Sequence, residues 1–370
     1  MSVSSLPFLQ DALAAVLPKL AAWRRDFHAH PEAGWTEFRT AALIIRRLHG
    51  LGYAIRMGEA ACAPGRRMGV PSPAVLEAAR ERALGHGADA GLVAGMGDGY
   101  TGFWADLDCG PGPVTAFRFD MDCNEVVECA EGSHRPAREG FASRWPGLMH
   151  ACGHDGHAAV GLGLAEVLVS IRRRLRGRIR LIFQPAEEGA RGALPMAEAG
   201  AVDGVDALFG FHIGFKAEGP GTLICGTQGF LATTKRDVLF SGVPAHAGAA
   251  PEEGKDALLA ACSAVVSLHA ISRNGKGGTR IAVGRLEGGE ARNVIPASGG
   301  KPRNWTPIWL PSPSVSCALP PICGAVPASG GLWGTAPGEG AARSLPVSLL
   351  RLRKRWAAGR RSSRWAVSGR

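Results

Sequence analysis

An α/β fold is predicted by two observations: short apolar runs alternate with amphipathic segments, and polar residues of reactive types follow the apolar runs directly. Three of the runs, at residues 114–119, 179–183 and 207–211, have the length and composition of buried strands. Residues 157–174 lie between the first two and are predicted to form a helix. Because function gathers at the carboxyl ends of strands in such sheets, we expect the reactive residues along one edge.

Two amphipathic helices are expected before the first strand, over residues 8–25 and 37–51, where apolar residues recur at helical spacing. Residues 56–100 are rich in Gly and Ala, include one predicted helix at 74–84, and are interpreted as an insertion between core elements. The catalytic domain is predicted to span residues 1–225.

A second, smaller domain is predicted for residues 226–298. Residues 233–240 alternate as a strand does, residues 257–271 have helical spacing, and residues 280–283 have the composition of a short strand. This succession of strand, helix and strand is typical of a small α+β domain.

The composition changes at Gly299. Nine of the 25 prolines and five of the nine tryptophans follow residue 300, and hydrophobic periodicity is largely lost there. We interpret residues 299–370 as a disordered tail that is frameshifted or otherwise non-native, because disordered basic segments are usually poor in aromatic residues. The alternative is a genuine Pro/Arg-rich extension.

The net charge of +10 comes from this tail, since positions 1–300 carry 31 basic and 31 acidic residues. The basic balance therefore gives no reason to expect a nucleic-acid partner. The nine cysteines have no paired framework, and no signal-peptide layout or membrane-length apolar run is present. These features predict a cytoplasmic chain with no membrane partner.

The strongest motif is the segment His150–His157, which reads His-Ala-Cys-Gly-His-Asp-Gly-His. Cys152 and His154 are metal-ligand types separated by one glycine, which lets the backbone turn tightly enough for both to face one site. A buried cysteine beside a helix-capping Asp155 would give a similar pattern. The motif alone leaves both interpretations open.

Two carboxylates, Glu187 and Glu188, follow the second predicted strand. They repel each other where water is excluded, and a nearby cation removes that cost; the alternative is a solvated loop pair. His212 follows the third strand and adds a nitrogen ligand, although a lone histidine there is more often a satisfied core residue. The combined sulfur, nitrogen and oxygen donors suit Zn²⁺ or Mn²⁺. The candidate ligands are Cys152, His154, Glu188 and His212.

These residues predict attack of a metal-activated water on an amide carbonyl, with Glu187 as the general base that takes and returns the proton. Two metal ions would clamp the water and polarise the carbonyl together. The Gly-x-Ser-x-Gly motif of serine hydrolases is absent, and Gly95–Gly99 is only a partial match to a dinucleotide fingerprint.

The order of these motifs resembles the family of hippurate hydrolases, auxin-conjugate hydrolases and carboxypeptidase-G-like enzymes. The resemblance spans residues 1–298, and residues 56–100, 133–136 and 140–143 are most similar to the branch that hydrolyses p-aminobenzoyl-glutamate. The segments that carry it are Arg24–Glu32, Asp120–Asp122, His150–His157, Gln184–Gly189, Phe211–Gly214, Ala245–Gly248 and Arg292–Pro296.

The resemblance implies a zinc-exopeptidase-like mixed sheet sandwiched by helices, with a smaller α+β lid used in dimerisation. It implies two divalent metal ions, Mn²⁺ or Zn²⁺, at the four candidate ligands, and Glu187 as the catalytic acid/base. A second catalytic residue, His246, is expected to stabilise the oxyanion, often in the neighbouring subunit. Arg292 and Asn293 are expected to bind the substrate carboxylate.

The resemblance also implies that Asp120 and Asp122 support the site, and that the chain forms a homodimer or a heteromer with a related subunit. The family has a further metal-binding histidine near its C-terminus, whereas no histidine follows His269 here. The predicted function is a metal-dependent amidohydrolase acting on p-aminobenzoyl-glutamate or a related N-acyl amino acid. The alternative is a truncated, catalytically impaired remnant or a non-catalytic subunit.

Overall fold

The computed structural model describes residues 7–214, 219, 221–224, 235–236, 238–272, 280–299, 326–327 and 332–333. The described residues up to 224 belong to one compact unit, unit 1, and those from 235 onward to a second, unit 2. Most of the predicted tail lies outside the described residues, so its disorder and the predicted domain limits stay predictions.

A five-stranded mixed sheet forms the centre of unit 1, in the order β1-β2-β4-β3-β5. β3 runs parallel to β4 and β5, whereas β2 runs antiparallel to β1 and β4. The strands are β1 (Ala54–Met57), β2 (Phe103–Asp108), β3 (Val114–Asp120), β4 (Arg178–Gln184) and β5 (Ala207–Gly210).

The central strand β4 is buried from Ile179 to Gln184, because it is paired on both edges and covered on both faces. It ends level with β3, where Asp120 is opposite Gln184. The residues that follow these two strands therefore emerge at the same edge of the sheet, as expected.

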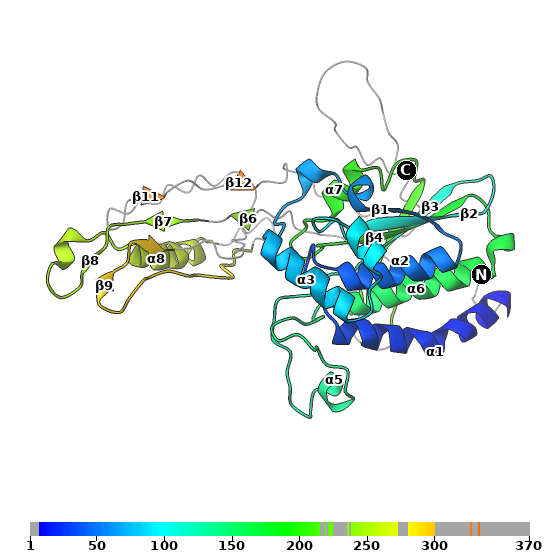
Figure 1. Ribbon diagram of the computed structural model, residues 1–370, viewed down its shortest axis with the longest axis horizontal. Helices are drawn as coiled ribbons and strands as arrows, with labels where there is room; N and C mark the ends of the chain where they lie inside the picture. The colour runs from blue at the N-terminus through cyan, green and yellow to red at the C-terminus, as the bar shows by residue number, and fades with distance from the viewer. Residues whose placement is uncertain are drawn as a thin grey trace, which may run out of the picture. The chain divides into compact units, whose positions relative to one another are not determined.

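Helices cover both faces of the sheet. Figure 1 shows α1 (Pro7–Ala29), α2 (Phe38–Gly50) and α6 (His154–Ser170) stacked beside one another, and α6 packs on β3 and β4. On the opposite face α7 (Ala193–Glu198) packs Met196 against a smaller apolar cluster. The predicted mixed sheet between helices is confirmed.

Residues 56–100 are more than an insertion. α3 (Pro73–Gly85) and α4 (Ala90–Gly95) pack against α2, and this segment places Leu76, Val93 and Met96 in the main hydrophobic core. Apolar side chains spaced for one helix face make the segment part of the packed body, so the peripheral interpretation is wrong.

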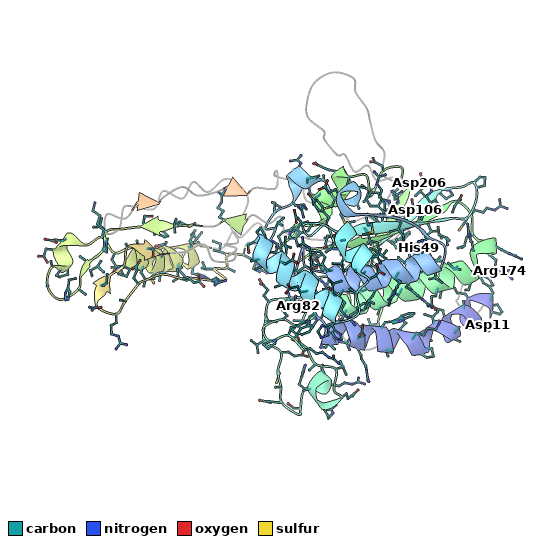
Figure 2. All side chains as sticks on the ribbon, viewed as in Figure 1. Asp11, His49, Arg82, Asp106, Arg174 and Asp206 are labelled. Atoms are coloured by element: carbon teal, nitrogen blue, oxygen red, sulfur yellow. The ribbon has the colours of Figure 1, made fainter. Side chains whose placement is uncertain are left out.

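The main core of unit 1 is aromatic at its centre. The Phe103 and Phe183 rings stack with centroids 4.9 Å apart, and Phe119 lies 5.3 Å from Phe183. Side chains fill the layers between the sheet and its helices (Figure 2). The remaining short elements of unit 1 are η2 (Gly58–Ala61), η3 (Pro64–Arg66), α5 (Arg135–Arg138) and η4 (Arg172–Arg174).

Unit 2 is built on one helix, α8 (Ala257–His269), which begins after Asp256, a residue whose side chain accepts a hydrogen bond from Leu259 N. The helix packs on β7 (Phe240–Ser241) and β10 (Ser298–Gly299). Its buried cluster consists of Phe240 and four alanines. The other elements are β6 (Lys235–Arg236), β8 (Ala245–His246), η5 (Pro251–Glu253), β9 (Val294–Ile295), β11 (Val326–Pro327) and β12 (Leu332–Trp333).

The strands of unit 2 pair antiparallel: β7 with β10 and β11, β6 with β12, and β8 with β9. The predicted strand at residues 280–283 is wrong, since only a single bridge residue occurs there, at Val283. Both edges of β7 are already occupied, which leaves this short run without that strand as a ladder partner. Part of the predicted strand 233–240 lies outside the described residues.

Among the described residues, no helix combines the length and the apolar character needed to cross a membrane.

Candidate metal centre

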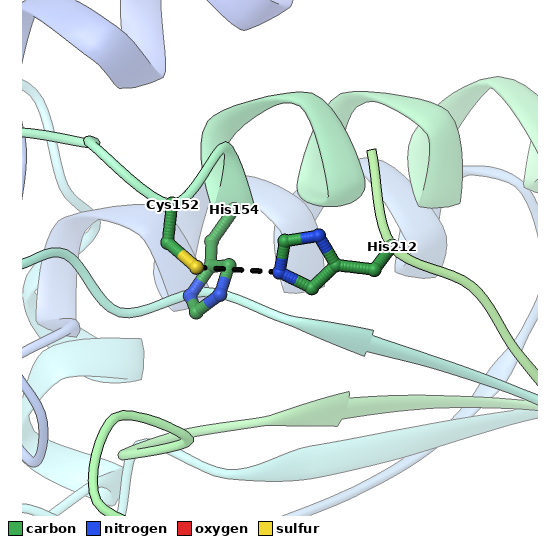
Figure 3. A group of neighbouring side chains, drawn as sticks. All are labelled: Cys152, His154 and His212. Atoms are coloured by element: carbon green, nitrogen blue, oxygen red, sulfur yellow. Dashed lines mark hydrogen bonds between the residues drawn. The ribbon is translucent and has the colours of Figure 1, made fainter. Parts of the chain in front are cut away.

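The N-terminus of α6 carries two of the predicted ligands. Gly153 precedes the helix with a left-handed φ of 88°, which glycine adopts without strain. This turn brings Cys152 beside the His154 ring (Figure 3). It also explains why the helix begins at His154 and not at the predicted residue 157.

His212 joins this pair from the segment after β5. Its Nδ1 donates a hydrogen bond to the Ile213 carbonyl oxygen at 2.8 Å, so a neutral ring leaves Nε2 with a free lone pair. Nε2 lies 3.2 Å from Cys152 Sγ, on the dashed line in Figure 3. The ligand atoms of Cys152, His154 and His212 all lie within 4.8 Å of one another.

The His154 ring is oriented in the same way. Its Nδ1 donates to the Asp122 carbonyl oxygen at 2.8 Å, which is a common way of fixing a metal-ligating histidine. Its Nε2 is buried and has no hydrogen-bond partner. Carboxylate oxygens of Asp120 and Glu187 lie 3.7 and 3.8 Å from Nε2, beyond hydrogen-bond distance.

The turn after β4 brings Glu187 and Glu188 to the same place. Ala186 has a left-handed φ of 45°, which interrupts the alternation that sends consecutive strand side chains to opposite faces. Ligand atoms of His154, Glu187 and Glu188 lie within 4.8 Å of one another. A left-handed conformation costs a residue with a Cβ about 1–2 kcal/mol, so the surroundings must hold it.

Asp122 holds this turn. Its carboxylate accepts hydrogen bonds from Glu187 N at 3.0 Å and from Glu188 N at 2.9 Å. Because its carbonyl also orients His154, one residue positions both segments that carry ligands. This is the supporting role expected for Asp122.

Asp120 supports the site through His157. Its carboxylate contacts His157 Nδ1 and accepts a hydrogen bond from Arg118 at 2.6 Å. His157 Nε2 accepts from Ile213 N at 2.9 Å, so the ring proton lies on Nδ1 and points at Asp120. The pair thereby anchors the segment that carries His212. Burial opposes ionisation of Asp120, but His157 and Arg118 hold its pKa at about 2.

The centre carries an excess of negative charge. Burial alone would lower the pKa of His154, yet the hydrogen bond with Asp122, the Cys152 contact and the nearby acids raise it to about 11. Burial raises the pKa of Glu187, and Asp122 adds to that effect. Such surroundings favour a bound cation.

The residues fit a divalent metal ion. Two buried atoms, His154 Nε2 and Glu188 Oε1, have no hydrogen-bond partner in the structure. A proton on His154 Nε2 would find no acceptor within hydrogen-bond distance, whereas a metal ion would use both lone pairs. The structure thus gathers all four predicted ligands around His154, with the donor types that Zn²⁺ and Mn²⁺ accept.

The predicted catalytic His246 lies in unit 2, at the end of β8. The N–H groups of Gly248 and Ala249 donate to its Nδ1 at 3.1 and 3.0 Å. A neutral ring must therefore carry its proton on Nε2, which makes that atom a hydrogen-bond donor.

Arg292 and Asn293 lie just before β9, the strand that pairs with the one bearing His246. The Asn293 carbonyl oxygen accepts a hydrogen bond from Ala247 N at 3.0 Å, and both predicted substrate-binding residues are exposed. The structure brings these residues close to His246 within unit 2. Their position relative to the metal ligands stays a prediction.

Comparison with known proteins decides the family. Residues 116–307 match the peptidase family M20/M25/M40. The chain belongs to this family. The predicted resemblance and fold are thereby confirmed.

Two curated relatives and one crystal structure are similar to this M20/M25/M40 chain. It is 50% identical over 293 residues to indole-3-acetyl-aspartic acid hydrolase of Enterobacter agglomerans, covering 79% of this chain and 67% of that protein. It is 50% identical over 291 residues to one of the subunits of p-aminobenzoyl-glutamate hydrolase of Escherichia coli (strain K12), covering 78% and 66%. The aminobenzoyl-glutamate utilization protein from Klebsiella pneumoniae superposes with a TM-score of 0.63 at 42% identity, covering 81% and 68%. This chain spans about two thirds of the length of these relatives.

Sequence reasoning does not single out Glu37 in this M20/M25/M40 chain. The structure places its carboxylate against the metal centre, where it accepts a hydrogen bond from Ala186 N at 2.8 Å. The available signal is weak: an acid just before an amphipathic helix, where helix caps are common. Its partner is 149 residues away in the sequence.

Proposed function

We propose that this chain is a metal-dependent amidohydrolase that cleaves an N-acyl amino acid, with p-aminobenzoyl-glutamate as the first substrate to test. The observation that carries the proposal is the cluster in which Cys152, His154, His212 and the Glu187–Glu188 pair converge. The two curated relatives are named for substrates in which an aromatic acyl group is joined to an acidic amino acid, which supports this substrate class.

The proposed cofactors are two divalent metal ions, Mn²⁺ or Zn²⁺. Bound ions would supply Lewis acidity toward the amide carbonyl oxygen and toward water. The residues that would hold them are Cys152, His154, Glu188 and His212, and the buried lone pairs of His154 and Glu188 support this assignment.

Glu187 is the proposed general base and acid. Its backbone is fixed by Asp122, whereas its side chain is 35% exposed and lies 3.8 Å from His154 Nε2. A carboxylate with a raised pKa is suited to take a proton from water and to return it to the leaving nitrogen.

His246 is proposed to stabilise the charge that develops on the carbonyl oxygen, because its Nε2–H is the available donor. Arg292 and Asn293 are proposed to bind the carboxylate of the amino-acid portion through a charge and an amide. We further propose assembly as a homodimer or with a related chain, supported by the name of the Escherichia coli relative, which describes one component of a larger hydrolase.

A cytoplasmic location is proposed from the cysteines, since Cys62, Cys109, Cys123, Cys129, Cys152 and Cys262 are all unpaired. The second candidate function is a catalytically impaired remnant or non-catalytic subunit. It is favoured by the absence of any histidine beyond His269 and by the coverage of only about two thirds of each relative.

The test is hydrolysis of p-aminobenzoyl-glutamate and indole-3-acetyl-aspartate by purified protein supplied with Mn²⁺ or Zn²⁺. Glu187→Gln should keep metal binding and lower kcat by about 10²–10⁴-fold. The matched control is Glu253→Gln, an exposed acid of unit 2 that should leave turnover unchanged. Absence of turnover from metal-loaded wild type would favour the impaired remnant.

A further inference from the structure

Glu37 occupies the N-cap position of α2, yet its side chain makes no cap hydrogen bond. It is 0% exposed. Its Oε1 accepts a hydrogen bond from Ala186 N at 2.8 Å, and its Oε2 pairs with the Thr101 hydroxyl at 2.5 Å. A carboxyl group is costly to bury unless it is hydrogen-bonded, and this one is bonded to the turn that precedes Glu187.

Ala186 is the residue at which that turn leaves the strand direction. It is left-handed and fully buried, in an apolar cluster with Trp35, Cys62 and Tyr100. Three consecutive N–H groups of the turn donate to carboxylates. That of Ala186 donates to Glu37, and the next two donate to Asp122.

The segment before α2 presses against the same turn. A Cβ on Gly34 would approach Ala186 Cα to 2.9 Å, and Trp35 is itself left-handed with a φ of 71°. Cys123 N donates to the Glu32 carbonyl oxygen at 2.8 Å, which ties the segment to the residue after Asp122. The two carboxylates that hold the turn therefore come from segments that are bonded to each other.

We propose that Glu37 is a positioning residue: its hydrogen bond to Ala186 N holds the left-handed turn that directs Glu187 and Glu188 to the same site. Asp122 orients the two glutamates, and Glu37 fixes the residue at which the chain turns toward them. The consequence for metal binding rests on the proposed function, whereas the consequence for the turn does not.

Two replacements separate the hydrogen bond from the shape of Glu37. Burial, followed by the charge of Asp122, raises the pKa of Glu37 to about 8, so its neutral form dominates near pH 7. Glutamine keeps an acceptor for Ala186 N and a polar group for Thr101. Leucine fills a similar space without an acceptor.

The experiment compares full-length wild type with Glu37→Gln, Glu37→Leu and the double variant Glu37→Leu/Ala186→Gly. The first readout is hydrogen exchange of the amides of residues 186–188 in metal-free protein. The second is Co²⁺ affinity, followed by its visible absorption. Glu32→Leu is the matched control, because Glu32 is an equally buried acid that accepts from Arg39 N and Thr40 N, in the first turn of α2.

We expect Glu37→Leu to speed exchange at the turn by roughly tenfold, the loss of one hydrogen bond. We expect it to weaken Co²⁺ binding by about 10- to 100-fold, as loss of a residue that orients a ligand does. Glu37→Gln should match wild type in both. Ala186→Gly should restore much of the Co²⁺ affinity in the double variant, because glycine adopts a positive φ without strain. Glu32→Leu should speed exchange in α2 and leave the turn unchanged.

Unchanged exchange at residues 186–188 in Glu37→Leu would overturn the proposal, whatever the metal affinity. Equal effects of Gln and Leu would also overturn it, because the acceptor would then not matter. If Glu37→Leu does not fold, the double variant supplies the same comparison with Glu37→Gln. Failure of wild type to bind Co²⁺ would reject the proposed metal centre alone, since the exchange measurement still tests the turn.

Discussion

Histidines of the two units are held in opposite ways. In unit 1, Nδ1 of His154 and of His212 donates to a backbone carbonyl oxygen, which leaves Nε2 as a lone pair. In unit 2, Nδ1 of His246 accepts from two backbone N–H groups, which leaves Nε2 as a donor. The backbone thus prepares the first two as metal ligands and the third as a hydrogen-bond donor to substrate.

The two units also differ in how firmly these side chains are supported. His154 lies over a core of stacked phenylalanines and is fully buried, whereas His246 is exposed in a unit whose buried cluster is one phenylalanine and four alanines. Metal ligands need a fixed geometry, while a residue that meets substrate must be reachable. The predictions below test this difference.

The largest effect is expected from replacing one histidine of each kind. His154→Ala should abolish metal binding, a greater loss than the roughly 100-fold caused by removing a residue that orients a ligand. His246→Ala should keep metal affinity and lower kcat by about 10²–10³-fold, because a donor to the carbonyl oxygen is lost. Metal titration and turnover separate the two, and weakened metal binding in His246→Ala would contradict the division of roles.

Core truncation comes next. Phe183→Ala should destabilise unit 1 by about 3–5 kcal/mol, because it empties the centre of the stacked cluster. Phe240→Ala should cost unit 2 less, since Phe240 is 8% exposed and its neighbours are small. Urea unfolding followed by hydrogen exchange assigns each loss to a unit. Loss of metal affinity in Phe240→Ala would show that the units are not independent.

Acid sensitivity should follow Asp26 of unit 1. Burial opposes its ionisation, but hydrogen bonds with His30 and Arg39 lower its pKa below the ordinary value. A lowered folded-state pKa adds stability above about pH 4 that is lost as the pH falls further.

Asp26→Asn should therefore cost about 1 kcal/mol or less at pH 7, a small value because 42% of the side chain is exposed to screening water. The difference from wild type should vanish toward pH 2, as measured by urea unfolding across pH. The control is Glu287→Gln, which removes the exposed Arg285–Glu287 pair of unit 2 and should change little at any pH. A difference that grows on acidification would contradict the sign.

The smallest effect is expected on the outer face of α8. Val266 is 70% exposed, and alanine is the better helix former there, so Val266→Ala should stabilise unit 2 by at most about 0.5 kcal/mol. The same exchange measurement detects it in α8 peptides. A clear loss of stability would mean that this face is covered in solution.

The ligands could be predicted because their signals are local. Cys152 and His154 are separated by one glycine, and the other ligands follow apolar strands whose ends meet by the rules of α/β sheets. Glu37 could not be predicted, because its role depends on a partner 149 residues away.

Other elements escaped prediction for the same reason. β2 contains Asp106, which interrupts its apolar pattern, and the structure shows that Arg180 of β4 neutralises it through two hydrogen bonds of 2.8 Å. Residues 280–283 have strand composition, yet a strand requires a ladder partner that sequence pattern alone does not supply. Local chemistry was readable in both cases, and distant pairing was not.

The strand order sets a timetable for the chain during synthesis. β4 pairs with both β2 and β3, and β3 also pairs with β5, so the sheet cannot close until Gly210 has been made. At about 5–20 residues per second, Glu37 waits roughly 7–30 s for Ala186 to be synthesised. During that interval the early amphipathic helices have no sheet to cover. The nascent chain is therefore most exposed to aggregation before its last ligand, His212, has been added.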